Sequence, residues 1–191
     1  MYIFKYNYYL NMKKIIIVFA LLSLLFSGCN QNEIELGKIY HNQSFNTDNL
    51  PNEFKILNEN VFVFSGEVQN DIFNHLEIII SSFKNDELID TEIKNFDLKL
   101  NSNSFNIFLE FNSDSSSANI CINSDELNTY SELLESSKLN NKFSFVPNTE
   151  STIIYSSGDN NYSNEILLGS LKEMNGSKIY DISFRLKYNP Q

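Results

Sequence analysis

The chain has 191 residues, of which 24 are Asp or Glu and 14 are Lys or Arg, so its formal charge is −10. Phosphate binding relies on clustered Lys and Arg, and the acidic balance therefore argues against a nucleic-acid partner. With 6 Gly and 3 Pro the chain is neither collagen-like nor proline-rich, and a hydrophobic fraction of 42% argues against global disorder. The length suits one domain with short appendages.

The N-terminal segment has the pattern of a secretion signal. Met12-Lys13-Lys14 is short and positively charged, and the apolar run 15–26 follows it. A membrane-spanning helix needs about 20 apolar residues, whereas this shorter run is typical of the apolar part of a signal peptide. We expect residues 1–28 to be a signal peptide, with Met12 as the start of translation because the aromatic prefix 1–11 fits no signal. The alternative to a cleaved signal peptide is an uncleaved membrane anchor. The alternative to a start at Met12 is a signal peptide whose N-terminal region extends back to Met1.

The apolar run ends in Leu25-Phe26-Ser27-Gly28-Cys29, which resembles the lipobox of bacterial lipoproteins. Ser27, Gly28 and Cys29 match the pattern of that family, while Phe26 stands where the family has Leu. In these proteins a dedicated signal peptidase cleaves before the cysteine, which carries acyl chains such as palmitate. The resemblance implies that Cys29 is lipidated and that its lipid holds the chain in a membrane of the bacterial cell envelope.

The residue after the lipobox cysteine bears on the choice of membrane. In the family that the lipobox resembles, Asp at this place retains a lipoprotein in the inner membrane. This chain has Asn30 there. The resemblance therefore implies the outer membrane, with the protein facing the periplasm or the cell surface.

The rest of the chain divides into a polar segment and a strand-rich domain. Residues 29–52 are mostly polar, and we expect them to form a tether that begins at the lipidated cysteine. From 53 to 191, short apolar or alternating segments recur, and such segments are typical of β-strands. The predicted strands include 61–68, 76–83, 96–100, 105–111, 153–155, 166–171 and 178–188, with Phe143 and Phe145 in another.

Two pairs of these segments predict hairpins. The segments 96–100 and 105–111 alternate with a period of two, and Asn101-Ser102-Asn103 between them is a plausible turn. Asn175-Gly176 precedes the strand 178–188 and supplies residues that tolerate the positive backbone angles of a tight turn.

One segment has helical spacing. Between 125 and 138, Leu127, Tyr130, Leu133 and Leu134 recur at intervals of three or four residues, which places them on one helical face. The patterns together predict a mainly β domain, a two-sheet antiparallel sandwich with one helical insertion at about 125–138.

The sequence shows no motif of catalysis or cofactor binding. His41 and His75 announce no metal site by their spacing, and the dispersed glycines form no phosphate-binding loop. Cys121 lies in an apolar, strand-like run, and we expect a buried, inert thiol there rather than a reactive nucleophile. We therefore expect no catalytic residue, no cofactor, no metal and no enzymatic activity.

Two functions stay open. The first is a membrane-anchored envelope lipoprotein whose non-catalytic β-domain binds an envelope protein, in assembly, secretion or virulence. The layout of a lipobox and a small β-sandwich resembles the lipoproteins that anchor type VI secretion complexes. Length and Asn/Ile/Lys-rich composition are similar to those of small lipoproteins encoded in Francisella-type pathogenicity islands. The second function is a periplasmic solute- or glycan-binding domain or hydrolase. A flat sandwich with an aromatic patch favours the first, and a deep pocket with convergent polar groups the second.

Overall fold

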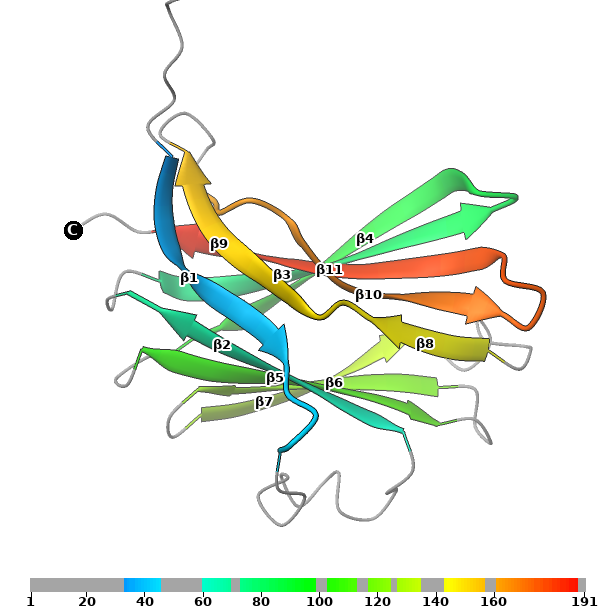
Figure 1. The fold of residues 1–191 in the computed structure, drawn as a ribbon, viewed down its shortest axis with the longest axis horizontal. Coiled ribbons are helices and arrows are strands. Elements are labelled where there is room, and N and C mark those ends of the chain that lie inside the picture. The colour runs from blue at the N-terminus through cyan, green and yellow to red at the C-terminus, as the bar shows by residue number, and fades with distance from the viewer. Residues whose placement is uncertain are drawn as a thin grey trace, which may run out of the picture. The chain divides into compact units, whose positions relative to one another are not determined.

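A computed structural model describes residues 33–45, 60–69, 73–98, 103–112, 117–124, 127–134, 143–156 and 161–188 of the protein (Figure 1). The contacts divide the chain into residues 1–32 and a compact unit of residues 33–191, and all the described residues belong to the second. The predicted signal peptide and the predicted lipidation site Cys29 lie outside the described residues.

The described residues form two sheets in which every pair of neighbouring strands is antiparallel. The six-stranded sheet has the spatial order β7 (Leu127–Leu134), β6 (Ser117–Ser124), β5 (Ser104–Asn112), β2 (Val61–Val68), β1 (Glu33–His41) and β9 (Glu150–Ser156). The five-stranded sheet has the order β4 (Glu87–Asp97), β3 (Phe73–Lys84), β11 (Lys178–Tyr188), β10 (Ile166–Glu173) and β8 (Phe143–Pro147). This mainly β architecture of two antiparallel sheets was predicted from the sequence.

The two sheets bury their facing surfaces against each other in one apolar core. Phe105 of β5 and Phe184 of β11 come from different sheets, and their ring centroids lie 6.2 Å apart. Along β11, alternate residues enter this core, because successive side chains of a strand point to opposite faces. The core members on β11 are Ile182, Phe184 and Leu186, each fully buried.

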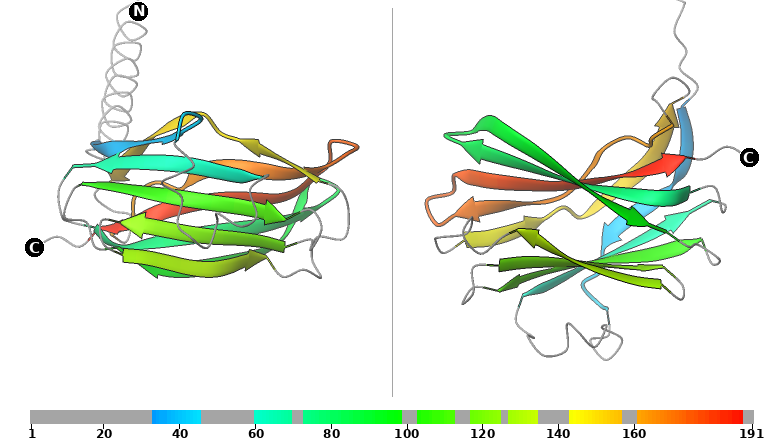
Figure 2. Two further views of the ribbon diagram at one scale, coloured as in Figure 1. Left: turned by 90° about the horizontal axis from the view of Figure 1, so that it is seen from below. Right: turned by 180° about the vertical axis from the view of Figure 1, so that it is seen from behind.

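A continuous strand path closes one side of the sandwich. β8 pairs with β10 in the five-stranded sheet, and the chain then passes through Asn148 and Thr149 into β9, which pairs with β1 in the six-stranded sheet. Figure 1 shows this path in yellow, and Figure 2 shows it from behind. The amide of Asn148 holds the corner, since it donates to the Leu167 carbonyl (3.0 Å) and to the Ser151 hydroxyl (3.1 Å).

The tight turns use residues that accept positive φ angles. Asn85 and Asp86 join β3 to β4 with φ of 53° and 63°, as a two-residue hairpin turn of the favoured handedness requires. Gly176, with φ of 89°, lies in the turn between β10 and β11, which form the hairpin expected from Asn175-Gly176. The Gly176 N–H donates to the Glu173 carbonyl across that turn (2.9 Å).

Several strand predictions are confirmed. β2 and β11 have the predicted bounds, 61–68 and 178–188, and β3 contains the predicted segment 76–83. Ile78, Ile79 and Ile80 are all buried, as a strand covered on both faces requires.

The predicted helix at 125–138 is wrong. Residues 127–134 form strand β7, and the flanks 125–126 and 135–138 lie outside the described residues. The register of β7 against β6 shifts between Ala118 and Asn119, which leaves Leu133 as an extra residue. This bulge allows the adjacent Leu133 and Leu134 both to be buried. Because the apolar residues of β7 do not alternate regularly, they recur at intervals of three or four residues, which is also the spacing of a helical face.

The predicted hairpin of 96–100 and 105–111 is also wrong. Residues 87–97 form β4 of the five-stranded sheet, whereas β5 belongs to the six-stranded sheet. Phe96 and Phe105 are both buried in the common core. The two segments therefore lie in opposite sheets and do not pair with each other. Each turns its apolar face toward the other sheet, which covers it.

The predicted tether of 29–52 overlaps the folded domain. Residues 33–41 form β1, which is hydrogen-bonded to β2 on one side and β9 on the other. The register with β9 shifts between Glu35 and Gly37, so Leu36 and Ile39 are both buried although they lie three positions apart, an odd spacing for one face of a regular strand. This bulge removes the period-two signal from the sequence.

Replacing Phe184 by Ala will test the core. Its side chain is fully buried, so we expect Phe184→Ala to lower the free energy of unfolding by about 3–5 kcal/mol. Ser183→Ala is the control on the opposite face of β11, and we expect it to change this free energy by about 1 kcal/mol or less. Chemical denaturation measures both variants, and equal losses would show that the facing of β11 is wrong.

Candidate functional site

The structure places Cys121, His75 and His41 in three different environments. Cys121 on β6 is buried with Phe108 and Val63 on the outer face of the six-stranded sheet, which confirms the expected buried thiol. His75 pairs with Asp97 at the surface (2.7 Å). His41 ends β1 with its ring 5.3 Å from that of Phe64, and burial lowers its pKa from 6.5.

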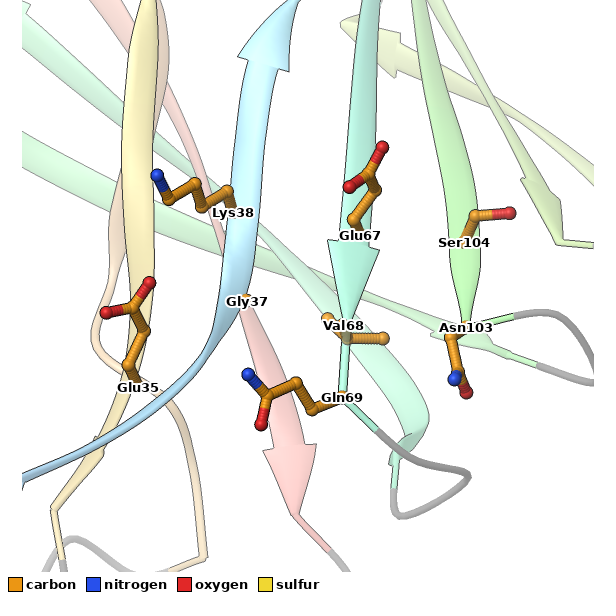
Figure 3. A pocket seen from close by; sticks show the side chains of 8 residues that line it. All are labelled: Glu35, Gly37, Lys38, Glu67, Val68, Gln69, Asn103 and Ser104. Atoms are coloured by element: carbon orange, nitrogen blue, oxygen red, sulfur yellow. The ribbon is translucent and has the colours of Figure 1, made fainter.

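An open groove of about 490 Å³ lies at one end of the six-stranded sheet. It is lined from β1, the end of β2 and the start of β5 (Figure 3). Its lining residues are Glu35, Gly37, Lys38, Glu67, Val68, Gln69, Asn103 and Ser104.

The backbone of Gly37 shapes the floor of this groove. A Cβ atom built on Gly37 would collide with the Glu67 carbonyl oxygen, so only glycine permits this approach of β1 to β2. At the bulge, the Gln69 N–H donates to the Leu36 carbonyl (2.6 Å), and the neighbouring Val68 N–H donates to the Asn103 carbonyl (2.8 Å). These bonds hold three separate segments of the chain together at the groove.

The chemistry of the groove is polar and of mixed charge. Glu35 and Glu67 supply carboxylates, Lys38 an ammonium group, and the remaining polar lining groups are amides and a hydroxyl. Figure 3 shows the Gln69 side chain extending from the end of β2 toward β1. Such groups can exchange hydrogen bonds with the hydroxyls of a sugar or another polar solute.

A buried charge network crosses the outer face of the five-stranded sheet. The Glu77 carboxylate on β3 is 7% exposed and accepts from Arg185 Nε of β11 (2.7 Å) and from the Tyr162 hydroxyl (2.8 Å). The Arg185 guanidinium also lies 4.2 Å from the centre of the Tyr162 ring. Each polar group has a partner, so the network holds the segment before β10 onto the sheet.

An aromatic cavity of about 250 Å³ opens between the sheets near β8. Its walls are mainly phenylalanine rings, and those of Phe62 and Phe145 lie 4.7 Å apart. The other lining residues are Asn60, Phe111, Phe143 and Ser144. The rings chiefly pack against one another, which accounts for part of the high phenylalanine content.

The side of the sandwich opposite β8 and β9 ends in two edge strands. β4 is the last strand of the five-stranded sheet and β7 the last of the six-stranded sheet. Lys94 Nζ of β4 donates to the Glu132 carbonyl of β7 (2.7 Å) and so links the two edges. Leu88, Ile89 and Ile93 of β4 are 60%, 61% and 45% exposed, respectively.

Among the described residues, no group of three or more His, Cys, Asp or Glu side chains could hold a metal ion. The described part of the chain also contains no helix long and apolar enough to cross a membrane. No protein-family model, curated protein or solved structure matches the chain.

The sequence did not predict the groove or the exposed edge. The groove joins residues near 35, 69 and 104, which are distant along the chain and meet only through strand pairing. The one signal was Gly37 between alternating residues, since an isolated glycine in a strand indicates a bulge or a close backbone approach.

The hydroxyl of Tyr162 provides a pH test of the charge network. Its hydrogen bond to Glu77, and to a lesser degree burial, raises the pKa of Tyr162 above 10.0. The folded chain therefore holds this proton more tightly than the unfolded chain, and the stabilisation is lost as the pH rises through the raised pKa. We expect the free energy of unfolding to fall more in the unmodified protein than in Tyr162→Phe as the pH rises above about 10, the ordinary pKa of a tyrosine. Equal losses would contradict the bond to Glu77.

Proposed function

We propose that the protein is a lipid-anchored lipoprotein of the bacterial envelope whose β-domain binds another protein without catalysis. The observation that carries the binding role is the group of exposed apolar side chains on the edge strand β4, Leu88, Ile89 and Ile93. Exposed aliphatic groups on an edge strand expose a chain to unwanted pairing, and native proteins commonly protect such edges. A binding role gives a reason for keeping them.

The anchoring role is supported by the sequence alone. Ser27-Gly28-Cys29 follows an apolar run, and β1 begins at Glu33, close behind the cysteine. The formal charge of −10 offers no attraction to anionic lipids, so acyl chains on Cys29 would supply the attachment, at about 0.8 kcal/mol per buried methylene. We propose the outer membrane as its place, because Asn30 follows the cysteine.

Metabolic labelling tests the lipid anchor, and crosslinking in the same cells tests the binding role. Radiolabelled palmitate is expected to enter the unmodified protein and not Cys29→Ser, which should accumulate as a slower-migrating precursor. Mild crosslinking should then capture the same envelope protein in repeated preparations of the unmodified chain. Cys121→Ser is the matched control, because that thiol is buried within the fold and should not change labelling. Label in Cys29→Ser would contradict lipidation, and the absence of any captured protein would contradict the binding role.

The groove supports a second candidate, a periplasmic solute- or glycan-binding domain. Its volume of about 490 Å³ lies within the range of small-molecule sites, and its polar groups come from three strands or their ends. Glu35 and Lys38 lie on β1, while Gln69 follows β2.

Titration with soluble oligosaccharides, including amino sugars, measures binding in the groove by NMR. If the second candidate is right, the amide signals of residues 35–38, 67–69 and 103–104 shift on titration. Gln69→Ala then weakens binding by about tenfold, the value of one well-formed hydrogen bond. Lys172→Ala, on β10 of the other sheet, leaves binding unchanged. Titration without shifts in the groove would exclude these sugars as ligands.

A further inference from the structure

The outer edge of β4 presents backbone groups that its sheet does not use. Within the described residues, β4 pairs with one strand only, β3. The Thr91 N–H donates to the side-chain carboxylate of Asp90 (2.8 Å), which places it outside the ladder to β3. In antiparallel pairs the backbone groups of alternate residues point to the same side. The N–H and C=O groups of Ile93 and Asn95 therefore also point to the outer edge.

The side chains along this edge combine apolar groups with negative charge. Leu88, Ile89 and Ile93 are well exposed on a strand that also carries the acids Glu87, Asp90, Glu92 and Asp97. Lys94 is its single cation, and it lies 3.3 Å from the Glu92 carboxylate. A strand that pairs here meets aliphatic contacts interspersed with carboxylates.

We propose that the outer edge of β4 accepts an extended segment of the partner protein as an added strand, and that this segment alternates apolar and basic residues. The proposal rests on the protein-binding role given above and assigns its surface. Backbone hydrogen bonds supply affinity in this mode of recognition, and side chains of alternate residues supply specificity. The basic residues follow from the excess of carboxylates on β4.

A small cavity beside β4 fits a basic side chain. It has a volume of about 80 Å³, with the carboxylates of Asp90 and Glu92 in its lining and the apolar groups of Ile80 and Leu134 beside them. A lysine or arginine can lay its aliphatic stem on apolar groups while its charge contacts a carboxylate. Ser82 and Tyr180 complete the lining, and Tyr180 adds an aromatic ring.

The same charges argue against a second copy as the occupant. Two β4 strands paired edge to edge would each contribute four acids and one lysine. Like charges directly opposite each other destabilise a strand pair. The acidic edge thus opposes self-association while it attracts a basic segment.

Binding of a synthetic peptide to the full-length protein in detergent micelles tests the proposal. The probe is a fluorescent peptide of about ten residues that alternates lysine and valine, long enough to cover one strand. The matched probe replaces lysine by glutamate. We expect a rise in fluorescence anisotropy with the lysine peptide and none with the glutamate peptide. Equal binding of the two peptides would overturn the proposal.

A pair of variants at one exposed position separates backbone from side chain. Asn95→Pro removes an outward N–H and leaves the ladder to β3 intact, so binding should weaken by about tenfold or more. Asn95→Ala keeps that N–H and should bind as the unmodified protein does. If Asn95→Pro binds equally well, the edge is not the site.

A third probe changes the peptide and leaves the protein unmodified, so the test still works if Asn95→Pro fails to fold. N-methylation of alternate residues along one edge of the lysine peptide removes its donors on that edge, while the other edge stays intact. Methylation of one edge should abolish binding, and methylation of the other should not. Equal binding of both methylated peptides would overturn strand addition.

Crosslinking in cells separates failure of this proposal from failure of the proposed function. Loss of the captured envelope protein in Asn95→Pro, with retention in Asn95→Ala, supports the edge. Retention in both variants overturns the edge and leaves the binding role standing. Sedimentation of the unmodified protein should show no dimer, and a dimer that Asn95→Pro abolishes would make a second copy the occupant and overturn the proposal.

Discussion

The burial of two apolar sheet faces against each other determines most of this structure. Phe64 and Phe105 of one sheet and Phe184 of the other are almost fully buried in a common core. Each strand must keep its apolar side turned inward, even where this breaks its regular alternation. The bulges at Leu36 and Leu133 follow from this requirement, since each restores an inward facing that the uninterrupted strand would lose.

The sequence predicted strands well and their partners poorly. Strands 61–68 and 178–188 were found because apolar side chains there alternate or cluster as sheet burial demands. β1 and β7 were missed because a bulge in each spoils the period of two. Alternation also says nothing about which sheet a strand joins, and so β4 and β5 were wrongly paired. Pairing depends on contacts across the whole fold.

The candidate sites differ in what a linear pattern can reveal. Cys29 was predicted from a contiguous motif, because the peptidases of the lipoprotein family read adjacent residues. The groove is built from backbone approaches at Gly37, Gln69 and Asn103, which a linear pattern does not encode. The exposure of the β4 edge depends on the place of β4 at the end of its sheet, which a linear pattern does not encode either. Its sequence of mixed aliphatic and acidic residues is ordinary for a largely exposed strand.

The position of β1 between two neighbouring strands has a mechanical consequence. β1 is the first described strand and lies between β2 and β9, antiparallel to both. A pull on the chain before Glu33, directed along the strand, would load the hydrogen bonds to both neighbours together, because those bonds run across the strand direction. An edge strand pulled from its end can instead peel away one bond at a time. Tension from the N-terminal side is thus shared across two ladders in shear, a geometry suited to a domain held under load.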